Sequence, residues 1–337
     1  MKKSGVVTRK MVAAEAGVTE TIVSYVLNNN RYVEKNKRLR VLETVKRLGY
    51  QPNAAARMLK LKKSNHLLFI ADNIKNEHFG ILISEIDRLL YDKGYFISLA
   101  KNRDNEQFVS HIINRQFDGV LISSISMREE YLSELANAGI PMVLLMNRAY
   151  RFDAPANVGY IYPGLYDGAR QCVRHLHAGG CRNIVYLDRI SARNHFSDRS
   201  DLRLCGFLDE MADLGCPCGN RNVISNCKSE EEVVGRIIAA VNDGFAIDGI
   251  AARNDSIAAL AIKAANRLGL SIPKQISIIG FDNSTLSRNI TPSITTMEMD
   301  RQAMAAGAVA MLEDLMQSKH PEPIRLATKL IVRDSTR

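Results

Sequence analysis

A metal or redox centre is the first chemistry to consider, because all six cysteines of the chain lie between residues 172 and 227. Structural zinc sites pair their cysteines as C-x2-C, whereas Cys216-Pro217-Cys218 leaves one residue between the thiols, with Cys227 further on. His175 and His177 are two residues apart, which would place them on different faces of a helix. The pattern predicts reduced thiols, no metal and no cofactor.

Catalytic signatures are also missing from the sequence. We find no G-x-x-x-x-G-K-S/T, no H-E-x-x-H and no G-x-S-x-G, and no G-x-G-x-x-G follows the first predicted strand of the body. The sequence therefore predicts a protein that is not an enzyme.

The charge of the chain is concentrated at its amino end. The formal net charge is +9, but residues 1–64 hold 15 Lys and Arg against 4 Glu, whereas the remainder holds 30 basic and 32 acidic residues. A basic head on a near-neutral body is typical of a module that binds a polyanion. Membrane binding would also use basic charge, but it needs a sided apolar helix with aromatic anchors, so the pattern favours DNA.

Residues 8–28, inside this basic head, read as two short amphipathic helices joined by a tight turn. Gly17 can take the positive φ that ends the first helix, and Thr19 is a good N-cap for the second. Two such helices form either an ordinary αα-hairpin or a helix-turn-helix, whose second helix enters the DNA major groove. The basic charge favours the second interpretation.

A third helix is expected at 34–48, with Val41, Leu42, Val45 and Leu48 as its apolar stripe and Gly49 just beyond its end. Pro52 then breaks the structure. Residues 54–60 have high helix propensity but little to bury, so we expect this segment to order only against a partner.

From residue 66 the pattern changes to apolar strands that alternate with amphipathic helices, which indicates parallel, doubly wound sheets. Asp118-Gly119 and Asp248-Gly249 sit at matching places and suggest two similar subdomains. The expected fold is a small all-α helix-turn-helix head plus an α/β core of two such subdomains. Strands are expected at 66–71, 95–100, 118–123, 141–146, 182–187, 221–225, 248–252 and 276–282, between residue 291 and the helix at 300–318, and at 326–332. Helices are expected at 79–93, 105–115, 128–138, 164–178, 200–214, 230–243, 255–268 and 300–318.

The amino terminus has no apolar signal region, and no apolar run approaches the length of a membrane span, so we expect a cytoplasmic protein.

Taken together, these motifs resemble the LacI family of transcription regulators, to which the lactose and purine repressors belong. The resemblance covers essentially the whole chain, and it rests on the order and spacing of many short motifs. They are Val12-Ala13, Ala16-Gly17-Val18-Thr19, Val23-Ser24, Val26-Leu27-Asn28, Leu48-Gly49-Tyr50, residues 52–59, Asn76-Glu77-His78-Phe79, residues 118–122, Arg203, Gly206-Phe207, Asn254-Asp255, Gly280-Phe281-Asp282, Thr291-Pro292 and Thr295-Thr296.

The resemblance implies a ligand-responsive repressor that binds a near-palindromic DNA operator as a homodimer, with a hinge helix between the head and a core of periplasmic-binding-protein type. No heptad-bearing tail follows the last strand, so we expect a dimer rather than a tetramer. An activator or global regulator of the same family, and a small-molecule-binding protein with no regulatory role, are the alternatives. The implied domains are 1–51 (head), 52–63 (hinge) and 64–337 (core), with one subdomain at 64–162 and 293–320 and the other at 163–292 and 321–337.

Residues 20–28 would form the recognition helix, with Glu20, Thr21 and Tyr25 facing the bases. Tyr25 stands where the family often has arginine. Glu20 would bring a negative charge toward DNA. It either changes the base specificity, by accepting a hydrogen bond from the amino group of cytosine, or merely stabilises the start of the helix. Met11 and Glu34 also depart from the family pattern. In the hinge, Leu59 matches the leucine that the family wedges into the minor groove. The implied DNA-binding residues are Thr8, Thr19, Glu20, Thr21, Ser24, Tyr25, Asn28, Asn53, Ala56, Arg57 and Leu59.

The resemblance also implies a small polar effector, a sugar or a derivative, bound between the two subdomains. Arg203, Asn254 and Asp282 would bind its polar groups and Phe79 would cover its apolar face, with Ser123 and Asn147-Arg148 as further candidates at strand ends. The alternatives are a surface salt bridge for Arg203 and a helix cap for Asn254. Glu77 replaces a frequent proline, so the effector need not be that of a relative.

Overall fold

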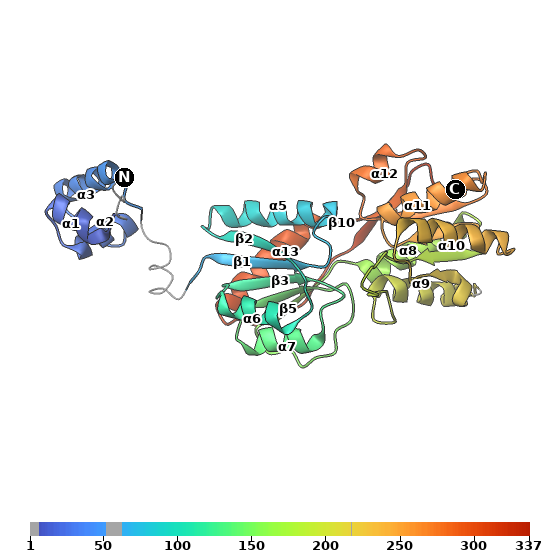
Figure 1. The fold of residues 1–337 in the computed structure, drawn as a ribbon, viewed down its shortest axis with the longest axis horizontal. Coiled ribbons are helices and arrows are strands. Elements are labelled where there is room, and N and C mark those ends of the chain that lie inside the picture. Colours follow the sequence, from blue (N-terminus) through green and yellow to red (C-terminus); the bar gives the residue numbers. More distant parts are fainter. Residues whose placement is uncertain (1–6, 52–62, 217) are drawn as a thin grey trace. The chain divides into compact units, whose positions relative to one another are not determined.

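The computed structural model describes residues 7–51, 63–216 and 218–337, and the chain divides into two compact units, Met1–Ser64 and Asn65–Arg337 (Figure 1). The expected hinge residues Asn53, Ala56, Arg57 and Leu59 lie outside the described residues.

The described residues of the first unit form the helices α1 (Arg9–Ala16), α2 (Glu20–Asn28) and α3 (Lys35–Leu48). The hydroxyl of Thr8 accepts the Met11 N–H at the start of α1, and that of Thr19 accepts the Ile22 N–H at the start of α2, both at 3.3 Å. Gly17 has a φ of 63° and ends α1. The two predicted helices and the turn between them are therefore confirmed.

The core of this unit is small. Val12 and Val23 are fully buried and pack with Val41 of α3. The apolar stripe expected on α3 is wrong at Leu42, which is 42% exposed, because Thr44 lies on the buried face instead. Glu34 precedes α3 without a side-chain cap bond and pairs with Lys37 at 3.0 Å.

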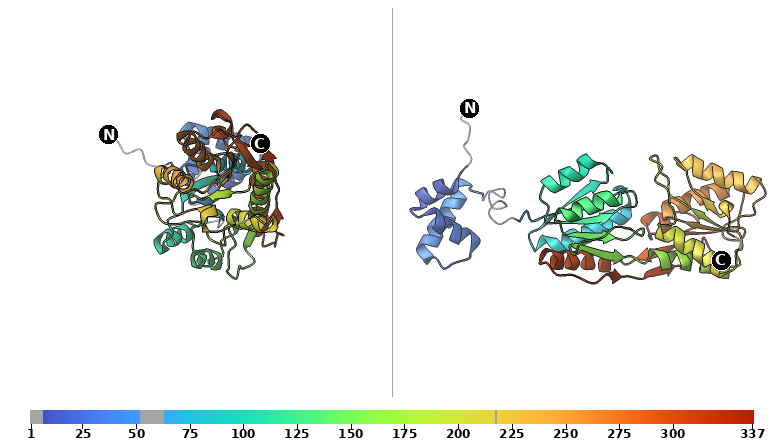
Figure 2. Two further views of the ribbon diagram at one scale, coloured as in Figure 1. Left: turned by 90° about the vertical axis from the view of Figure 1, so that its right-hand side faces the viewer. Right: turned by 90° about the horizontal axis from the view of Figure 1, so that it is seen from below.

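The second unit contains two sheets, each with helices on both faces (Figures 1 and 2). The first has the order β11-β5-β4-β3-β1-β2 and is parallel throughout. Its strands are β1 (His66–Ala71), β2 (Phe96–Lys101), β3 (Gly119–Ser123), β4 (Met142–Leu145), β5 (Val158–Tyr162) and β11 (Ile324–Arg325), and its helices are α5 (Glu77–Tyr91), α6 (Glu106–Asn114), α7 (Glu129–Asn137) and α13 (Arg301–Met316). We call this part of the unit the first lobe.

The second sheet has the order β12-β10-β9-β8-β6-β7, and only β12 runs antiparallel to its neighbour. Its strands are β6 (Ile184–Leu187), β7 (Val223–Ile224), β8 (Gly249–Ala252), β9 (Ser277–Phe281), β10 (Thr295–Met299) and β12 (Thr328–Ile331). Its helices are α8 (Leu165–Ala178), α9 (Leu202–Asp213), α10 (Glu230–Asn242), α11 (Asp255–Arg267) and α12 (Thr285–Asn289), and a 3-10 turn spans Asn220–Asn222. We call this part the second lobe.

The expected fold class is confirmed, but some elements differ from the prediction. The strand β5, the short strand β11 and the short helix α12 were not expected. The chain crosses between the sheets after β5, after β10 and between β11 and β12. The expected boundaries put 293–320 in the first lobe and 321–337 in the second, whereas backbone pairing places β10 in the second sheet and β11 in the first.

The matching Asp-Gly pairs of the two lobes have the same structural role. Asp118 accepts the N–H of Asn65 at 2.9 Å, just before β1, and Asp248 accepts the N–H of Asn183 at 2.8 Å, just before β6. In both lobes an aspartate at the start of the neighbouring strand therefore holds the first strand in register.

None of the helices in the described part of the chain combines the length and the apolar character needed to cross a bilayer.

Candidate functional site

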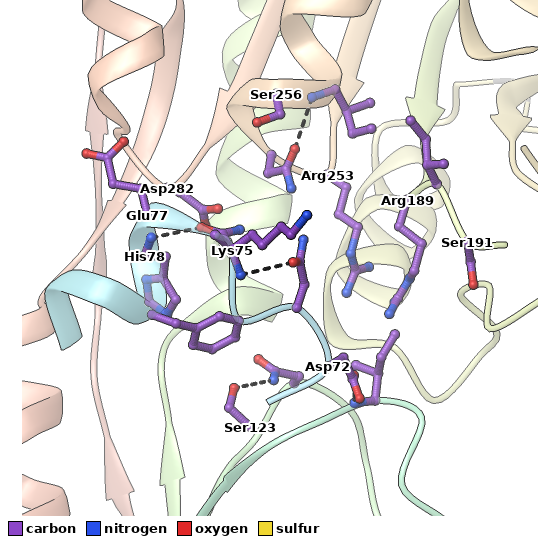
Figure 3. Close-up of a pocket in the computed structure, with 18 of the residues that line it drawn as sticks. Asp72, Lys75, Glu77, His78, Ser123, Arg189, Ser191, Arg253, Ser256 and Asp282 are labelled. Atoms are coloured by element: carbon purple, nitrogen blue, oxygen red, sulfur yellow. Dashed lines mark hydrogen bonds between the residues drawn. The ribbon is translucent and has the colours of Figure 1, made fainter. Parts of the chain in front are cut away.

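A cleft with a volume of about 710 Å³ is lined by residues of both lobes (Figure 3). The loops after β1, β3 and β4 line it from the first lobe, and those after β6, β8 and β9 line it from the second, so the carboxyl ends of parallel strands meet there. The secondary candidate Arg148 is not among the lining residues, but the other six candidates all line this one cleft: Phe79, Ser123, Asn147, Arg203, Asn254 and Asp282.

Arg203 and Asp282 form an ion pair inside the cleft. The Arg203 Nη2 lies 3.4 Å from Asp282 Oδ1, and the guanidinium lies 4.5 Å from the centre of the Phe281 ring. Arg203 is only 9% exposed, and its Nε has no hydrogen-bond partner among the described residues. Arg203 thus does form a salt bridge, but the alternative is wrong about its place, because the pair is buried and not on the surface.

Asp282 has an unusual backbone. Its φ is 102°, a region that side chains rarely adopt, and Arg301 donates a hydrogen bond to its carbonyl oxygen. The N–H of Asp282 donates to the carbonyl of Met297 at 2.8 Å. These contacts compensate for the strained conformation that directs the carboxylate to Arg203.

Asn254 caps α11, since its Oδ1 accepts the Ile257 N–H at 3.0 Å. The cap alternative is therefore correct for the oxygen, and the residue still lines the cleft. In the first lobe, Asn147 donates to the hydroxyl of Ser123 at 2.8 Å, so these two strand-end candidates contact each other.

The sequence interpretation missed two arginines in the second lobe. Arg189 and Arg253 line the cleft, and each donates to Asp201 Oδ2 at 2.7 Å. Asp188 stands close to both, at 3.7 and 3.8 Å. A usable signal was present, because Asp188-Arg189 and Arg253-Asn254 each follow directly on an apolar strand.

His78 lies beside the predicted aromatic Phe79 and was not predicted to bind. Its ring Nδ1 accepts from Arg301 Nε at 3.2 Å. Burial, and then the charge of Arg301, lower the pKa of His78 to about 3. His78 is therefore neutral at physiological pH, and its proton is on Nε2.

Asp255 follows the cap of α11 and holds the loop after β9. It accepts from the Ser284 N–H at 2.7 Å and from the Thr296 hydroxyl at 2.6 Å. Burial raises the pKa of Asp255 to about 6 despite these hydrogen bonds.

The predicted DNA-reading surface is the outer face of α2. Glu20, Thr21 and Asn28 are exposed, and Ser24 and Tyr25 are half-buried. Asn28 donates to the carbonyl of Ser24 at 2.9 Å, and Arg31 lies 5.2 Å from the centre of the Tyr25 ring. The helix α2 contains no Lys or Arg. The first basic residue after its end is Arg31. The hydroxyls of Thr8 and Thr19 serve as helix caps.

Within the described ranges all six cysteines are free, with Cys218 exposed and Cys205 half-buried. No three His, Cys, Asp or Glu side chains of residues 7–51, 63–216 and 218–337 are arranged to hold a metal ion.

Comparison with known proteins agrees with this architecture. Residues 9–53 match the family described as bacterial regulatory proteins, lacI family, and residues 173–336 match the periplasmic binding protein-like domain. The HTH-type transcriptional repressor PurR of Yersinia pestis bv. Antiqua (strain Antiqua) is 28% identical over 335 residues, which covers 97% of this chain and 96% of that protein.

Two solved structures show the same fold. A crystal structure of the Lac repressor dimer bound to operator and the anti-inducer ONPF matches with a TM-score of 0.83 at 22% identity, over 98% of this chain and 99% of that one. A periplasmic binding protein/LacI transcriptional regulator from Alkaliphilus metalliredigens QYMF, complexed with D-xylulofuranose, matches with a TM-score of 0.67 at 26% identity, over 81% and 100% of the two chains. The chain therefore combines a lacI-family DNA-binding domain with a periplasmic binding protein-like domain, which is the make-up of a ligand-responsive, DNA-binding transcription regulator.

Proposed function

We propose that this regulator is a repressor without catalytic activity, which acts in the cytoplasm. It binds a near-palindromic operator as a dimer, and a small polar effector in the cleft controls its affinity for DNA. The observation that carries the proposal is the convergence of six candidate effector residues on one cleft, in a chain with a basic helix-turn-helix head.

The proposed effector is a sugar or a sugar derivative. Arg203 and Asp282 present directional donors and acceptors from the second-lobe wall. Phe79 stands on the first-lobe wall, where its ring centre lies 5.9 Å from that of Phe69. Such a combination suits a ligand with polar edges and an apolar face.

The proposed dimer surface lies on the first lobe. Tyr91 and Phe96 are 71% and 70% exposed, and Ile81 and Leu99 are also exposed. Phe96 and Leu99 belong to β2, which is the edge strand of its sheet. An apolar patch at a sheet edge favours a second copy of the chain as its cover.

The proposed domains are the head at 1–51, the hinge at 52–63 and the core at 64–337. Within the core, the strand pairings support moving Thr295–Met299 to the second lobe and Ile324–Arg325 to the first. In the hinge, we expect Leu59→Ala to weaken operator binding far more than non-specific binding, since a minor-groove wedge acts only on bent DNA. Equal losses would argue against the wedge.

The first test is selection of duplex DNA from a random pool by the full chain. We expect a near-palindromic duplex, and an affinity that falls log-linearly with salt because the head displaces counterions from phosphates. Failure to enrich any duplex, or binding that salt does not change, would contradict the proposal.

The second test is a thermal-shift screen of sugars, sugar phosphates and nucleobases, followed by operator binding with each hit. The variant Arg203→Ala should lose the ligand response and keep operator binding. A variant that still responds normally would remove Arg203 from the effector site.

A further inference from the structure

Arg189 and Arg253 form a pair of neighbouring cations on the second-lobe wall of the cleft. Both donate to Asp201, and both also donate to the hydroxyl of Ser197, at 3.0 and 2.9 Å. The bonds of Arg253 all leave from Nη1 and those of Arg189 from Nη2, so one terminal nitrogen of each has no hydrogen-bond partner among the described residues. Figure 3 shows both side chains extending into the cavity.

Asp188 and Asp201 lie beside Arg189 and Arg253, and their negative charges raise the pKa of Arg253 although burial lowers it. Burial, and then the positive charge of Arg253, lower the pKa of Arg189 to about 10. The pKa of Arg203 is lowered by burial and by Arg253 in the same way. The Nε atoms of Arg189 and Arg203 are buried and have no partner in the described part of the chain. An anion at the free terminal nitrogens would stabilise the charged form of Arg189, which is buried beside a second cation.

The carboxylates of the cleft walls are engaged by the protein's own donors. Asp72 accepts from the Ser124 hydroxyl at 2.6 Å and the Ile125 N–H at 2.7 Å. Asp255 accepts from Ser284, and Glu77 accepts from Thr285. A ligand hydroxyl that must donate a hydrogen bond finds few free acceptors on these walls.

Donors, in contrast, remain available around the same space. Lys75 projects into the cavity from the first lobe (Figure 3), and its amine has no ion-pair or hydrogen-bond partner within the described ranges. Lys101 and Arg193 also line the cleft and are exposed. The oxygen of Asn254 is used as a cap, which leaves only its NH2 group for a ligand. The start of α11 faces the cleft as well and favours negative charge.

We infer that the effector carries an anionic group, a carboxylate or a phosphate, which binds between Arg189 and Arg253 of the second lobe and Lys75 of the first. The free guanidinium nitrogens and the lysine amine all donate, and an anion needs only donors. The pair of Arg203 and Asp282 stays available for the hydroxyl groups of the same molecule. The inference rests on the proposed effector role of the cleft.

The first experiment measures anion binding to the full chain without knowledge of the natural effector. Thermal unfolding and calorimetric titration are followed with sulfate and with inorganic phosphate at constant ionic strength, using chloride as the reference. We expect saturable binding that raises the melting temperature of the core transition. Lys75→Ala should weaken it about five- to tenfold, the loss of one charge-assisted hydrogen bond.

The matched control is Lys274→Ala, an exposed lysine that does not line the cleft. It should leave the anion affinity unchanged. The basic head can also bind anions. Equal anion affinities in the wild type, Lys75→Ala and Lys274→Ala would therefore show an adventitious ion only and would overturn the inference. Arg189→Lys serves as a second variant that keeps the charge but loses the planar donor set, and it should also bind more weakly.

The second experiment separates carboxylate from phosphate with matched compounds: D-glucose, D-gluconate and D-glucose 6-phosphate, and the corresponding galactose series. We expect one of the anionic forms to bind more tightly than its neutral parent, and this preference to disappear in Lys75→Ala. A neutral sugar that binds more tightly, and whose binding is lost in Arg203→Ala, would overturn the anionic class and leave the proposed function intact. A chain that selects no operator would instead contradict the proposed function.

Discussion

The carboxylate of Glu77 joins the two lobes by accepting both the backbone N–H and the hydroxyl of Thr285. The oxygens of Glu77 lie 3.0 and 3.2 Å from Thr285 N, and one lies 2.7 Å from its hydroxyl. Glu77 is the first residue of α5 and Thr285 the first residue of α12, so the contact links the starts of two helices at the edge of the cleft. It is a direct consequence of the glutamate that replaces the family's frequent proline.

Removal of this contact should loosen closure of the cleft. In Glu77→Ala we expect a broader distribution of lobe separations in small-angle scattering from the ligand-free protein. The free energy of unfolding should change by no more than about 1 kcal/mol, because both residues are exposed. The control is Glu130→Ala, whose side chain is 78% exposed in the first lobe. Identical scattering from both variants and the wild type would show that the contact does not control closure.

The helix-turn-helix should depend on its cap and its turn. Thr19→Ala removes the acceptor of the Ile22 N–H and should destabilise the head by about 1 kcal/mol. Gly17→Ala places a side chain at a φ of 63° and should cost about as much again. Thr21→Ala, on an exposed position of the same helix, is the control. Circular dichroism of the full chain would follow the head transition, and three equal transitions would disprove the assignment of cap and turn.

Close packing of α8 against α9 should be sensitive to a single methyl group at Gly206. A Cβ there would lie 2.3 Å from the carbonyl oxygen of Tyr166, which is backbone and cannot easily move. Gly206→Ala should therefore destabilise the core by about 2–4 kcal/mol. Gly235→Ala in α10 has nothing within 4 Å of its Cβ and should stabilise slightly by helix propensity. Equal melting temperatures for the two variants would contradict this packing argument.

Stability of the core should fall on mild acidification, because His78 is buried in its neutral form. Its pKa is about 3 in the folded state against 6.5 when exposed, so between these values the unfolded chain binds more protons. The contribution is fully present above pH 6.5 and is lost as the pH falls toward 3. At pH 5 this effect lowers the free energy of unfolding by about 2 kcal/mol.

The matched comparison is His78→Gln, which keeps a hydrogen-bond acceptor for Arg301 and cannot titrate. The raised pKa of Asp255 acts in the opposite sense, since its stabilisation is present below pH 3.8 and is lost as the pH rises through about 6. Asp255 is the same in both proteins, so the difference between their denaturant-unfolding curves from pH 7.5 to pH 5 isolates His78. Parallel pH profiles would refute the prediction.

Local signals identified most of the fold. Gly17 and Thr19 act within one turn of the chain, so the helix break could be predicted from neighbouring residues alone. The strand β5 was missed although Val158, Tyr160 and Tyr162 alternate as strand residues do. It lies close before α8, and its burial comes from β4 and α13, which are distant in sequence. Leu42 was misplaced because only packing decides which of two adjacent residues faces inward.

The candidate site likewise contains residues that short motifs could identify and residues that only the folded chain brings together. The family motifs located Arg203, Asn254 and Asp282, and the structure placed all three on one cleft. Arg189 and Arg253 are 64 positions apart in the chain, and their pairing on Asp201 depends on the adjacency of β6 and β8 in the sheet. No local pattern could have shown that they share one carboxylate.

By itself, the sequence determined the basic head, the alternation of strands and helices and the family, since these depend on composition, periodicity and the order of short motifs. Only the tertiary structure decided which carboxylates of the cleft are already engaged and which cations are free, and that Glu77 reaches Thr285. The physical reason is that hydrogen-bond satisfaction and burial depend on groups far apart in the chain, and these meet only when the two sheets have formed.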